Sequence, residues 1–323
     1  MMLMHNIGTE NLYVRNRWGI NMQDIKKYAK IGLVHHLLYP ECTKDRDYHI
    51  NTLSDFVLRE DIEALDCCIP YGETYRNSGI IPKVRDCGKD VAYALHFFPA
   101  RKISLSSLDI QEQEISKIVI KDQIDVAAKI GANGFVFVSG ADVPYNRDGA
   151  RKAFKEFCIW FCAELKKHNM EALLEPFDRT IDKKFLYGPV VDCVRLMDDL
   201  HQEGITNIGI ELDMAHLPLM FEDFESSIER CAPYLKRVHL GNCVLKDKKH
   251  PFYGDMHPPI GLEGGEIDTP ELKIILKKLL EVGYLDNKDR KPLILEMQPF
   301  PGKTVEYTIE ESFRRLNDAW NMI

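Results

Sequence analysis

Four side chains of metal-ligand type stand at the ends of apolar runs in the second half of the chain. Three runs end in Glu175, Asp213 and Glu296, and the run between the last two contains His239. If these runs are neighbouring parallel strands of a barrel, their carboxyl ends bring the four side chains together. Clustered carboxylates shielded from water repel one another, and the repulsion raises their pKa values unless a cation neutralises them. The arrangement therefore predicts a metal site.

The donor set predicts one divalent ion. Three carboxylates and one imidazole suit Mn²⁺ first, with Mg²⁺, Co²⁺ and Zn²⁺ as alternatives. Taken singly, an acid after a strand is more often a helix cap, and a histidine is more often a hydrogen-bonded polar residue. Four such residues at equivalent strand ends favour the metal site over these ordinary roles.

Three further residues of the apolar runs have two open interpretations each. Glu211 lies two residues before Asp213, so the two side chains point to the same face of the predicted strand. Glu211 could therefore either support the metal site or form a buried salt bridge. His35 and His36 lie in the first run, where one of them could line the pocket. Packing between the barrel and a helix explains these two histidines equally well.

Short apolar runs alternate with amphipathic stretches along the whole chain, which is the pattern of a parallel sheet whose strands are joined by helices. Runs with nearly continuous apolar character are expected when helices cover the sheet. Eight runs are predicted to be strands, at residues 31–39, 64–69, 91–98, 134–139, 170–175, 208–213, 237–241 and 292–297.

Helical spacing is clearest where Phe154, Phe157 and Phe161 recur at intervals of three and four residues. A second helix start is indicated by Asp268, a capping residue, followed by a proline in the first turn. The segment between the second and third runs lacks periodicity and contains Pro82, so its helix is the least defined.

The order of these elements predicts an α/β protein with one closed (β/α)8 TIM barrel. No linker divides the chain, and no GxGxxG motif follows a strand to favour an open doubly wound sheet. We expect residues 1–30 to be an N-terminal extension and residues 31–323 to form the catalytic barrel domain. The active site of such a barrel lies at the C-terminal ends of the strands, where the predicted ligands stand.

The composition excludes several classes of protein. The 323 residues are 45% hydrophobic and 28% charged, with a formal charge of −8, which is ordinary for a folded chain and disfavours a general binder of nucleic acid or anionic membranes. No signal peptide or membrane-spanning segment is recognisable. The nine cysteines are odd in number and lack a CxxC motif, so we expect reduced core thiols and a cytoplasmic protein.

Six segments resemble, in order, motifs of the xylose isomerase-like TIM-barrel superfamily, which includes ketose 3-epimerases, hydroxypyruvate isomerase, inosose dehydratase and endonuclease IV. Each motif is weak alone, but six in the same order are specific to the superfamily, and the likeness covers most of the chain. The segments are LHFFPARKISLSS (95–107), LEPFDR (174–179), LDMAH (212–216), VHLGN (238–242), DMHPPIGLEGGEID (255–268) and LILEMQP (293–299).

The resemblance implies a divalent-metal-dependent isomerase or epimerase of a sugar, ketose or polyol, with one ion held by the four predicted ligands. Glu175 and Glu296 would be the catalytic pair on opposite faces of the substrate carbon, one removing a proton and the other returning one through an enediolate. His96, His216 and His257 would bind substrate oxygens. The implied partner is a small carbohydrate, and homo-oligomers are common among relatives.

Two departures from the family patterns keep other activities open. Ketose 3-epimerases carry another acid just after the Glu-Pro segment, where this chain has Thr180 and Ile181. Endonuclease IV has a histidine ligand at the end of strand four, where this chain has Ser139. The alternatives are an inosose-type dehydratase and an abasic-site zinc nuclease, which would need a basic groove. The residues that could line such a groove are Arg101, Lys102, Arg147 and Arg179.

Overall fold

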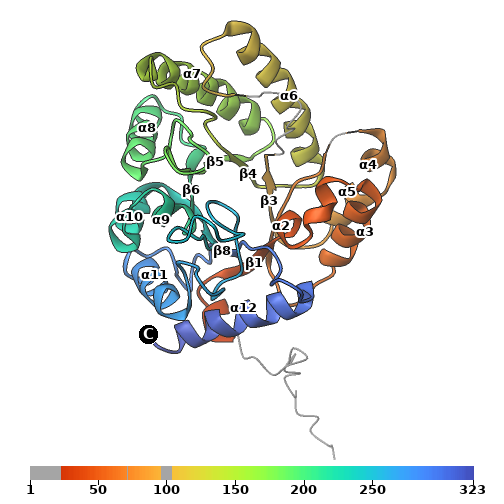
Figure 1. Cartoon of the computed structure of the whole chain (residues 1–323). Helices are drawn as coiled ribbons and strands as arrows, with labels where there is room; N and C mark the ends of the chain where they lie inside the picture. The colour runs from red at the N-terminus through yellow and green to blue at the C-terminus, as the bar shows by residue number, and fades with distance from the viewer. Residues whose placement is uncertain (1–22, 71, 96–103) are drawn as a thin grey trace, which may run out of the picture.

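Eight parallel strands close into a barrel, which confirms the predicted TIM-barrel fold (Figure 1). The structure, a computed structural model, describes residues 23–70, 72–95 and 104–323. Each strand pairs with its neighbours in sequence, and β8 pairs with β1 to close the ring. The strands are β1 (Lys30–Val34), β2 (Ala64–Cys67), β3 (Asp90–Ala94), β4 (Gly134–Phe137), β5 (Glu171–Leu174), β6 (Ile208–Asp213), β7 (Leu235–Leu240) and β8 (Pro292–Leu295).

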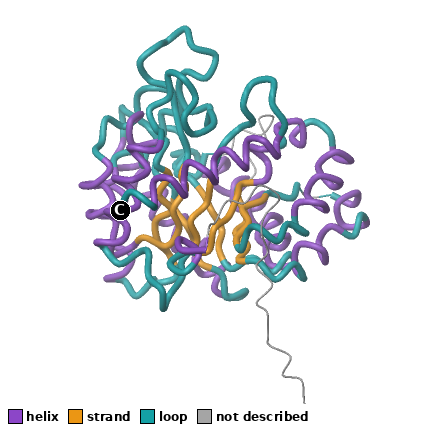
Figure 2. Tube along the Cα trace, turned by 90° about the horizontal axis from the view of Figure 1, so that it is seen from below, coloured by secondary structure: helices purple, strands orange, loops and turns teal. Residues whose placement is uncertain are grey.

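Helices surround the barrel and cover its outer face (Figures 1 and 2). The buried phenylalanines Phe154, Phe157 and Phe161 lie on one face of α7, as their spacing predicts. Asp268 and Glu271 form a capping box at the start of α11. The helices are α1 (Gln23–Lys26), α2 (His35–Leu38), η1 (Pro40–Thr43), α3 (Arg46–Phe56), α4 (Glu73–Asn77), α5 (Ile80–Arg85), α6 (Ile110–Lys129), α7 (Arg147–Lys166), α8 (Val190–Gln202), α9 (His216–Leu219), α10 (Phe224–Cys231), η2 (Ala232–Tyr234), α11 (Thr269–Glu281) and α12 (Val305–Trp320).

The first predicted strand is too long. Strand β1 ends at Val34, the last of its residues that pairs with β2, and the chain turns directly into α2. Leu38 in α2 is still buried in the core, and an apolar run of this kind does not distinguish a strand from a buried helix. The poorly defined second helix is two short helices, α4 and α5, with Pro82 in the first turn of α5.

Long connections follow the C-terminal ends of β5 and β7, at residues 175–189 and 241–268. Loops rise from one end of the ring of strands in Figure 2. These loops contribute side chains to the candidate site.

Other features of the chain bear on the remaining expectations. Ile25 and Ala29 belong to the main hydrophobic core, immediately before β1. The division between residues 1–30 and 31–323 stays a prediction. All nine cysteines are free, and eight of them are buried, as expected of core thiols. No helix within the described ranges is long and apolar enough to cross a membrane.

Candidate active site

The four predicted metal ligands lie at the C-terminal end of the barrel, and all four are buried. The main chain fixes two of them, because the Glu175 amide donates to the Phe137 carbonyl on β4 and the Glu296 amide donates to the Leu240 carbonyl on β7. Each of these glutamates therefore starts from a backbone position set by the neighbouring strand.

The buried ligands fall into two adjacent groups. Potential ligand atoms of Glu175, His239 and Glu296 lie within 4.8 Å of one another, and those of Asp213, His216 and His257 form a second such group. The groups are in contact, since His216 Nδ1 lies 3.5 Å from Glu175 Oε1. Three of the predicted ligands thus share one group, and Asp213 lies in the other.

His239 is held between two carboxylates. Its Nδ1 lies 2.5 Å from Glu296 Oε2, and its Nε2 lies 3.0 Å from Asp66 Oδ2 on β2. Asp66 in turn accepts hydrogen bonds from the Arg237 guanidinium, whose Nε lies 3.0 Å from each carboxylate oxygen. A carboxylate that binds the far nitrogen of a histidine orients the ring as a metal ligand and raises its basicity.

Asp66 and Arg237 belong to the candidate site through their contacts, and the sequence interpretation missed them. Both are buried inside the barrel. A signal for them did exist, because Asp66 is the only acid in the otherwise apolar second run, and Arg237 begins the seventh run two residues before His239. A lone charge in a run that must be buried needs an opposite charge nearby.

Buried carboxylate oxygens without hydrogen bonds fit a bound cation. Asp213 Oδ1 accepts from the Ala215 and Gly241 amides at 3.0 Å each, but Asp213 Oδ2 has no hydrogen-bond partner among the described residues. Both oxygens of Glu211 also lack one within the same ranges, although His239 Nδ1 lies 3.4 Å from Oε1. Buried acceptors left without a donor are costly, and a divalent ion would satisfy them.

The acids shift one another's protonation. Burial, together with the charges of Glu211 and Glu296, holds the pKa of Glu175 well above its usual range. Burial raises the pKa of Glu211 to about 8 against the opposing charge of His239, and burial also raises the pKa of Asp213. Burial opposes ionisation of Glu296 too, but the charges of His239 and His257 together outweigh it and lower the pKa of Glu296 to about 2. The two predicted catalytic glutamates therefore favour opposite protonation states in the metal-free chain.

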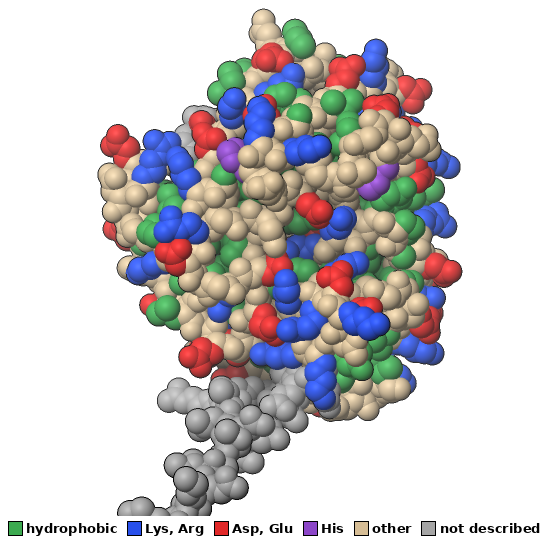
Figure 3. All heavy atoms as spheres, turned by 180° about the vertical axis from the view of Figure 1, so that it is seen from behind, with side chains coloured by type: hydrophobic (Ala, Val, Ile, Leu, Met, Phe, Trp, Pro, Cys, Tyr) green, Lys and Arg blue, Asp and Glu red, His purple; other side chains and the backbone are tan. Residues whose placement is uncertain are grey.

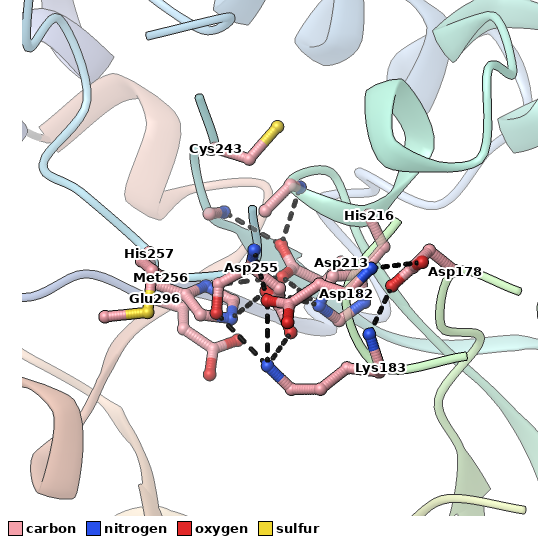
Figure 4. Close-up of polar contacts among 12 residues, drawn as sticks. Asp178, Asp182, Lys183, Asp213, His216, Cys243, Asp255, Met256, His257 and Glu296 are labelled. Carbon is pink, nitrogen blue, oxygen red and sulfur yellow. Dashed lines mark hydrogen bonds and ion pairs between the residues drawn. The ribbon is translucent and has the colours of Figure 1, made fainter. Parts of the chain in front are cut away.

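Asp255 links the second group to a lysine. Asp255 Oδ1 lies 3.2 Å from His216 Nε2 and 2.8 Å from His257 Nε2, and Lys183 Nζ lies 2.8 Å from Oδ2. Figure 4 shows Asp255 between the two imidazole rings, with Lys183 reaching towards it from the loop after β5. Although burial disfavours the charged carboxylate, the two histidines hold the pKa of Asp255 well below its usual range. Asp178 orients that loop by accepting from the Lys183 amide at 2.8 Å.

A cavity of about 420 Å³ opens at this end of the barrel. Its polar lining includes Glu175, His239, Glu296, His257 and Lys183, and aromatic and aliphatic side chains line it as well. The dimensions and mixed lining suit a small polar ligand.

The remaining predicted site residues have different positions relative to the cavity. His36 lines it, whereas His35 is fully buried away from it. His216 is also fully buried, with Nδ1 donating to the Pro176 carbonyl at 2.9 Å, so its position supports the orientation of Asp255. His96 lies outside the described residues.

The family model described as a xylose isomerase-like TIM barrel matches residues 87–319. This chain belongs to the xylose isomerase-like TIM-barrel family. The resemblance inferred from the six motifs is therefore confirmed. No curated protein matches the chain.

Solved structures of this family share the fold at low sequence identity. A D-tagatose 3-epimerase-like protein has a TM-score of 0.65 at 15% identity, covering 91% of this chain and 97% of that protein. An AP endonuclease of family 2 from Brucella melitensis gives 0.64 at 16% identity, with 87% and 96% covered. The D-psicose 3-epimerase from Clostridium cellulolyticum H10, solved with D-tagatose, gives 0.62 at 16% identity, with 91% and 97% covered. Identities this low establish the common fold alone.

The metal-free form of this barrel is expected to lose stability as the pH rises from 4.5 to about 8. Glu211 has its pKa raised by burial, so the folded chain holds a proton that the unfolded chain releases above pH 4.5, and each upward step favours unfolding. His257 acts in the same direction, because Asp255 and Glu296 together outweigh burial and raise its pKa to about 10. The stability that its charge contributes is lost as the pH rises through that value. Urea unfolding of chelator-treated protein across this range measures the effect.

A matched pair of variants isolates Glu211. Glu211→Gln should flatten the pH dependence, whereas the exposed Glu263→Gln should leave it unchanged. Equal slopes in the parent chain and Glu211→Gln would show that Glu211 is ionised in the folded metal-free protein and that its charge is compensated by some other group.

Proposed function

We propose that the chain is a divalent-metal-dependent isomerase or epimerase of a sugar, ketose or polyol. The observation that carries the proposal is a pair of buried glutamates, Glu175 and Glu296, which form one group with His239. All three side chains line the cavity. Glu175, Asp213, His239 and Glu296 would hold the ion, and the unsatisfied buried oxygen of Asp213 supports that fit, as do the two of the adjacent Glu211. When bound, the ion supplies a Lewis acid that stabilises negative charge on a substrate oxygen next to the reacting carbon.

The two glutamates would carry the proton transfers. Glu296, whose pKa is lowered to about 2 because His239 and His257 together outweigh the effect of burial, is ionised at neutral pH and can accept the proton of the substrate carbon. Glu175, whose pKa is raised by burial and by Glu211, can deliver a proton to the other face of that carbon. Delivery to the opposite face inverts the centre, and delivery to the neighbouring carbon isomerises the sugar.

Other residues would bind and orient the substrate. His257 and Lys183 line the cavity and present N–H donors that suit the hydroxyl groups of a carbohydrate. His216 contacts Asp255, so it would position both of these donors through that carboxylate. Direct contact of His216 and His96 with substrate oxygens stays a prediction.

Two observations favour a sugar enzyme over the nuclease alternative. Lys183 places an ammonium group against Asp255, where a polynuclear centre would need room for a further cation. Arg147 and Arg179 are engaged by carboxylates, at 2.7 Å from Asp142 and 2.8 Å from Asp192, so neither offers an unpaired charge to a phosphate backbone. Arg101 and Lys102 lie outside the described residues. On the face seen in Figure 3, opposite the end of the barrel from which the long loops rise in Figure 2, acidic and basic side chains are interspersed.

Solvent exchange tests the proposed reaction. A panel of ketoses and polyols is incubated with the Mn²⁺-loaded protein in deuterated water, and recovered sugars are analysed by NMR and mass spectrometry. We expect deuterium at the carbon next to the carbonyl, because a carboxylate that holds the proton can exchange it with solvent. Chelation with EDTA should abolish the label, and added Mn²⁺ should restore it.

Other outcomes of this screen point to the alternative activities. A deoxy or enol product with loss of water would identify a dehydratase, which uses the same base and ion. Cleavage of abasic DNA, with no exchange in any sugar of the panel, would favour the nuclease and overturn the proposed function.

A further inference from the structure

A second cluster of ligand-type side chains lies in the segment between β1 and β2, outside the candidate active site. His35 is in α2, Cys42 is in η1 and His49 is in α3. One potential ligand atom of each residue lies within 4.8 Å of the other two. We propose that these three side chains bind one Zn²⁺ ion, distinct from the ion of the active site.

The cluster is withdrawn from solvent and surrounded by aromatic rings. The exposed fractions of His35, Cys42 and His49 are 0%, 3% and 1%. The imidazole rings of His35 and His49 lie 5.3 Å apart between centroids, with planes 15° from parallel. Tyr39 and Phe56 pack against His35 on its other sides. Polar atoms in such surroundings need a partner, since burying them without one costs free energy.

Thr52 determines which nitrogen of His35 is available. The Thr52 hydroxyl donates to the Tyr48 carbonyl at 2.8 Å, so it accepts from His35 Nε2 at 3.1 Å. The ring proton is therefore on Nε2, and Nδ1 keeps its lone pair. Nδ1 is buried and has no hydrogen-bond partner in the part of the chain that the structure describes. A histidine whose far N–H donates to an oxygen is oriented as metal-binding histidines are.

The charges of the cluster also suit a cation. Burial and the neighbouring His49 hold the pKa of His35 well below its usual range, so the ring is neutral and its lone pair is available. Burial raises the pKa of the Cys42 thiol to about 11, and its sulfur lies 3.8 Å from the His36 carbonyl, which is a long contact. A bound cation would compensate the buried thiolate and release its proton.

The donor types distinguish this ion from that of the active site. Two imidazoles and one thiolate are the ligands that Zn²⁺ prefers, whereas Mn²⁺ and Mg²⁺ prefer the oxygens of the carboxylate-rich centre. Three protein ligands leave a fourth position of the tetrahedron for another donor. The ion would join α2, η1 and α3. Since His36 and Leu37 of α2 line the cavity, the ion would also brace that part of its lining.

Cobalt spectroscopy on the full chain tests the site. Co²⁺ replaces Zn²⁺ in tetrahedral sites, and a thiolate ligand gives Co²⁺ a strong near-ultraviolet charge-transfer band that oxygen and imidazole ligands do not give. Titration of chelator-stripped protein should develop the band at one equivalent, and Zn²⁺ should remove it. Absence of the band, or its persistence when Zn²⁺ is added, would overturn the proposal and leave the active-site proposal untouched.

Three variants assign the band to this cluster. Cys42→Ser should abolish it, whereas Cys243→Ser, at a buried thiol near the active-site carboxylate Asp213, should retain it. The reverse result would place the thiolate at the active site and refute the cluster. Thr52→Val removes the acceptor of His35 and should weaken Co²⁺ binding by about 10- to 100-fold. An unchanged affinity in Thr52→Val would contradict the assignment, and this variant carries the test if Cys42→Ser does not fold.

Discussion

Glu296→Gln is expected to lower kcat by about 10²- to 10⁴-fold while substrate binding changes little. The substitution keeps the shape of the side chain and one oxygen donor, but it removes the group that accepts the substrate proton. Glu296 is the ionised member of the pair, because His239 and His257 together outweigh burial and lower its pKa to about 2. Single-turnover rates and substrate binding measured on Mn²⁺-loaded protein separate loss of chemistry from loss of affinity.

Glu175→Gln is the matched variant, and it distinguishes two bases from one. If Glu296 alone takes the proton, Glu175→Gln should still label recovered substrate in deuterated water while forming little product. With the same substrate, Glu296→Gln should neither label the recovered substrate nor form product. Both substitutions remove the charge of a proposed metal ligand, so the metal content of both variants must be measured to separate loss of the ion from loss of the base. Near-full turnover of Glu296→Gln, under conditions in which chemistry limits the rate, would refute the two-carboxylate mechanism.

The barrel could be predicted from the sequence because its strands are buried on both faces and its helices on one. Those constraints leave apolar runs and helical stripes that are visible residue by residue, as in Phe154, Phe157 and Phe161 of α7. The end of β1 could not be predicted in this way. Leu38 is as buried in α2 as it would be in a strand, and the pairing of Val34 with β2 decides where the strand stops.

The sequence predicts those site residues that lie at the end of a strand. It does not predict contacts between side chains on different sides of the barrel. Glu175, Asp213 and Glu296 follow or end their strands, so topology alone brings them near one another. The approach of Asp66 to His239 joins residues far apart in sequence, and it depends on the register of the closed sheet. Lys183 reaches Asp255 through a loop whose conformation depends on hydrogen bonds to Asp178.

Arg237 is the residue whose loss is expected to cost the fold most among the charged groups around the site. Its side chain is buried, and it forms charge-assisted hydrogen bonds to Asp66, with Asp90 3.3 Å from Nη1. Removing one partner of a buried ion pair leaves the other charge without compensation, which costs about 3–5 kcal/mol. Arg237→Met should lower the free energy of unfolding by about that amount in urea denaturation at neutral pH.

Arg290→Met is the control, because Arg290 Nη2 lies 2.5 Å from Glu63 Oε2, as Arg237 Nη2 does from Asp66 Oδ1, but the side chains of Arg290 and Glu63 are about one-third exposed. A solvated pair contributes about 0–1 kcal/mol, so this variant should unfold close to the parent. The double variant Asp66→Asn with Arg237→Met should be less destabilised than the sum of the two single variants, because the uncompensated carboxylate is gone. Equal losses in Arg237→Met and Arg290→Met would mean that water reaches Asp66 and replaces the guanidinium. In that case Asp66 could not hold His239 rigidly, and the orientation of this metal ligand would have to depend on Glu296 alone.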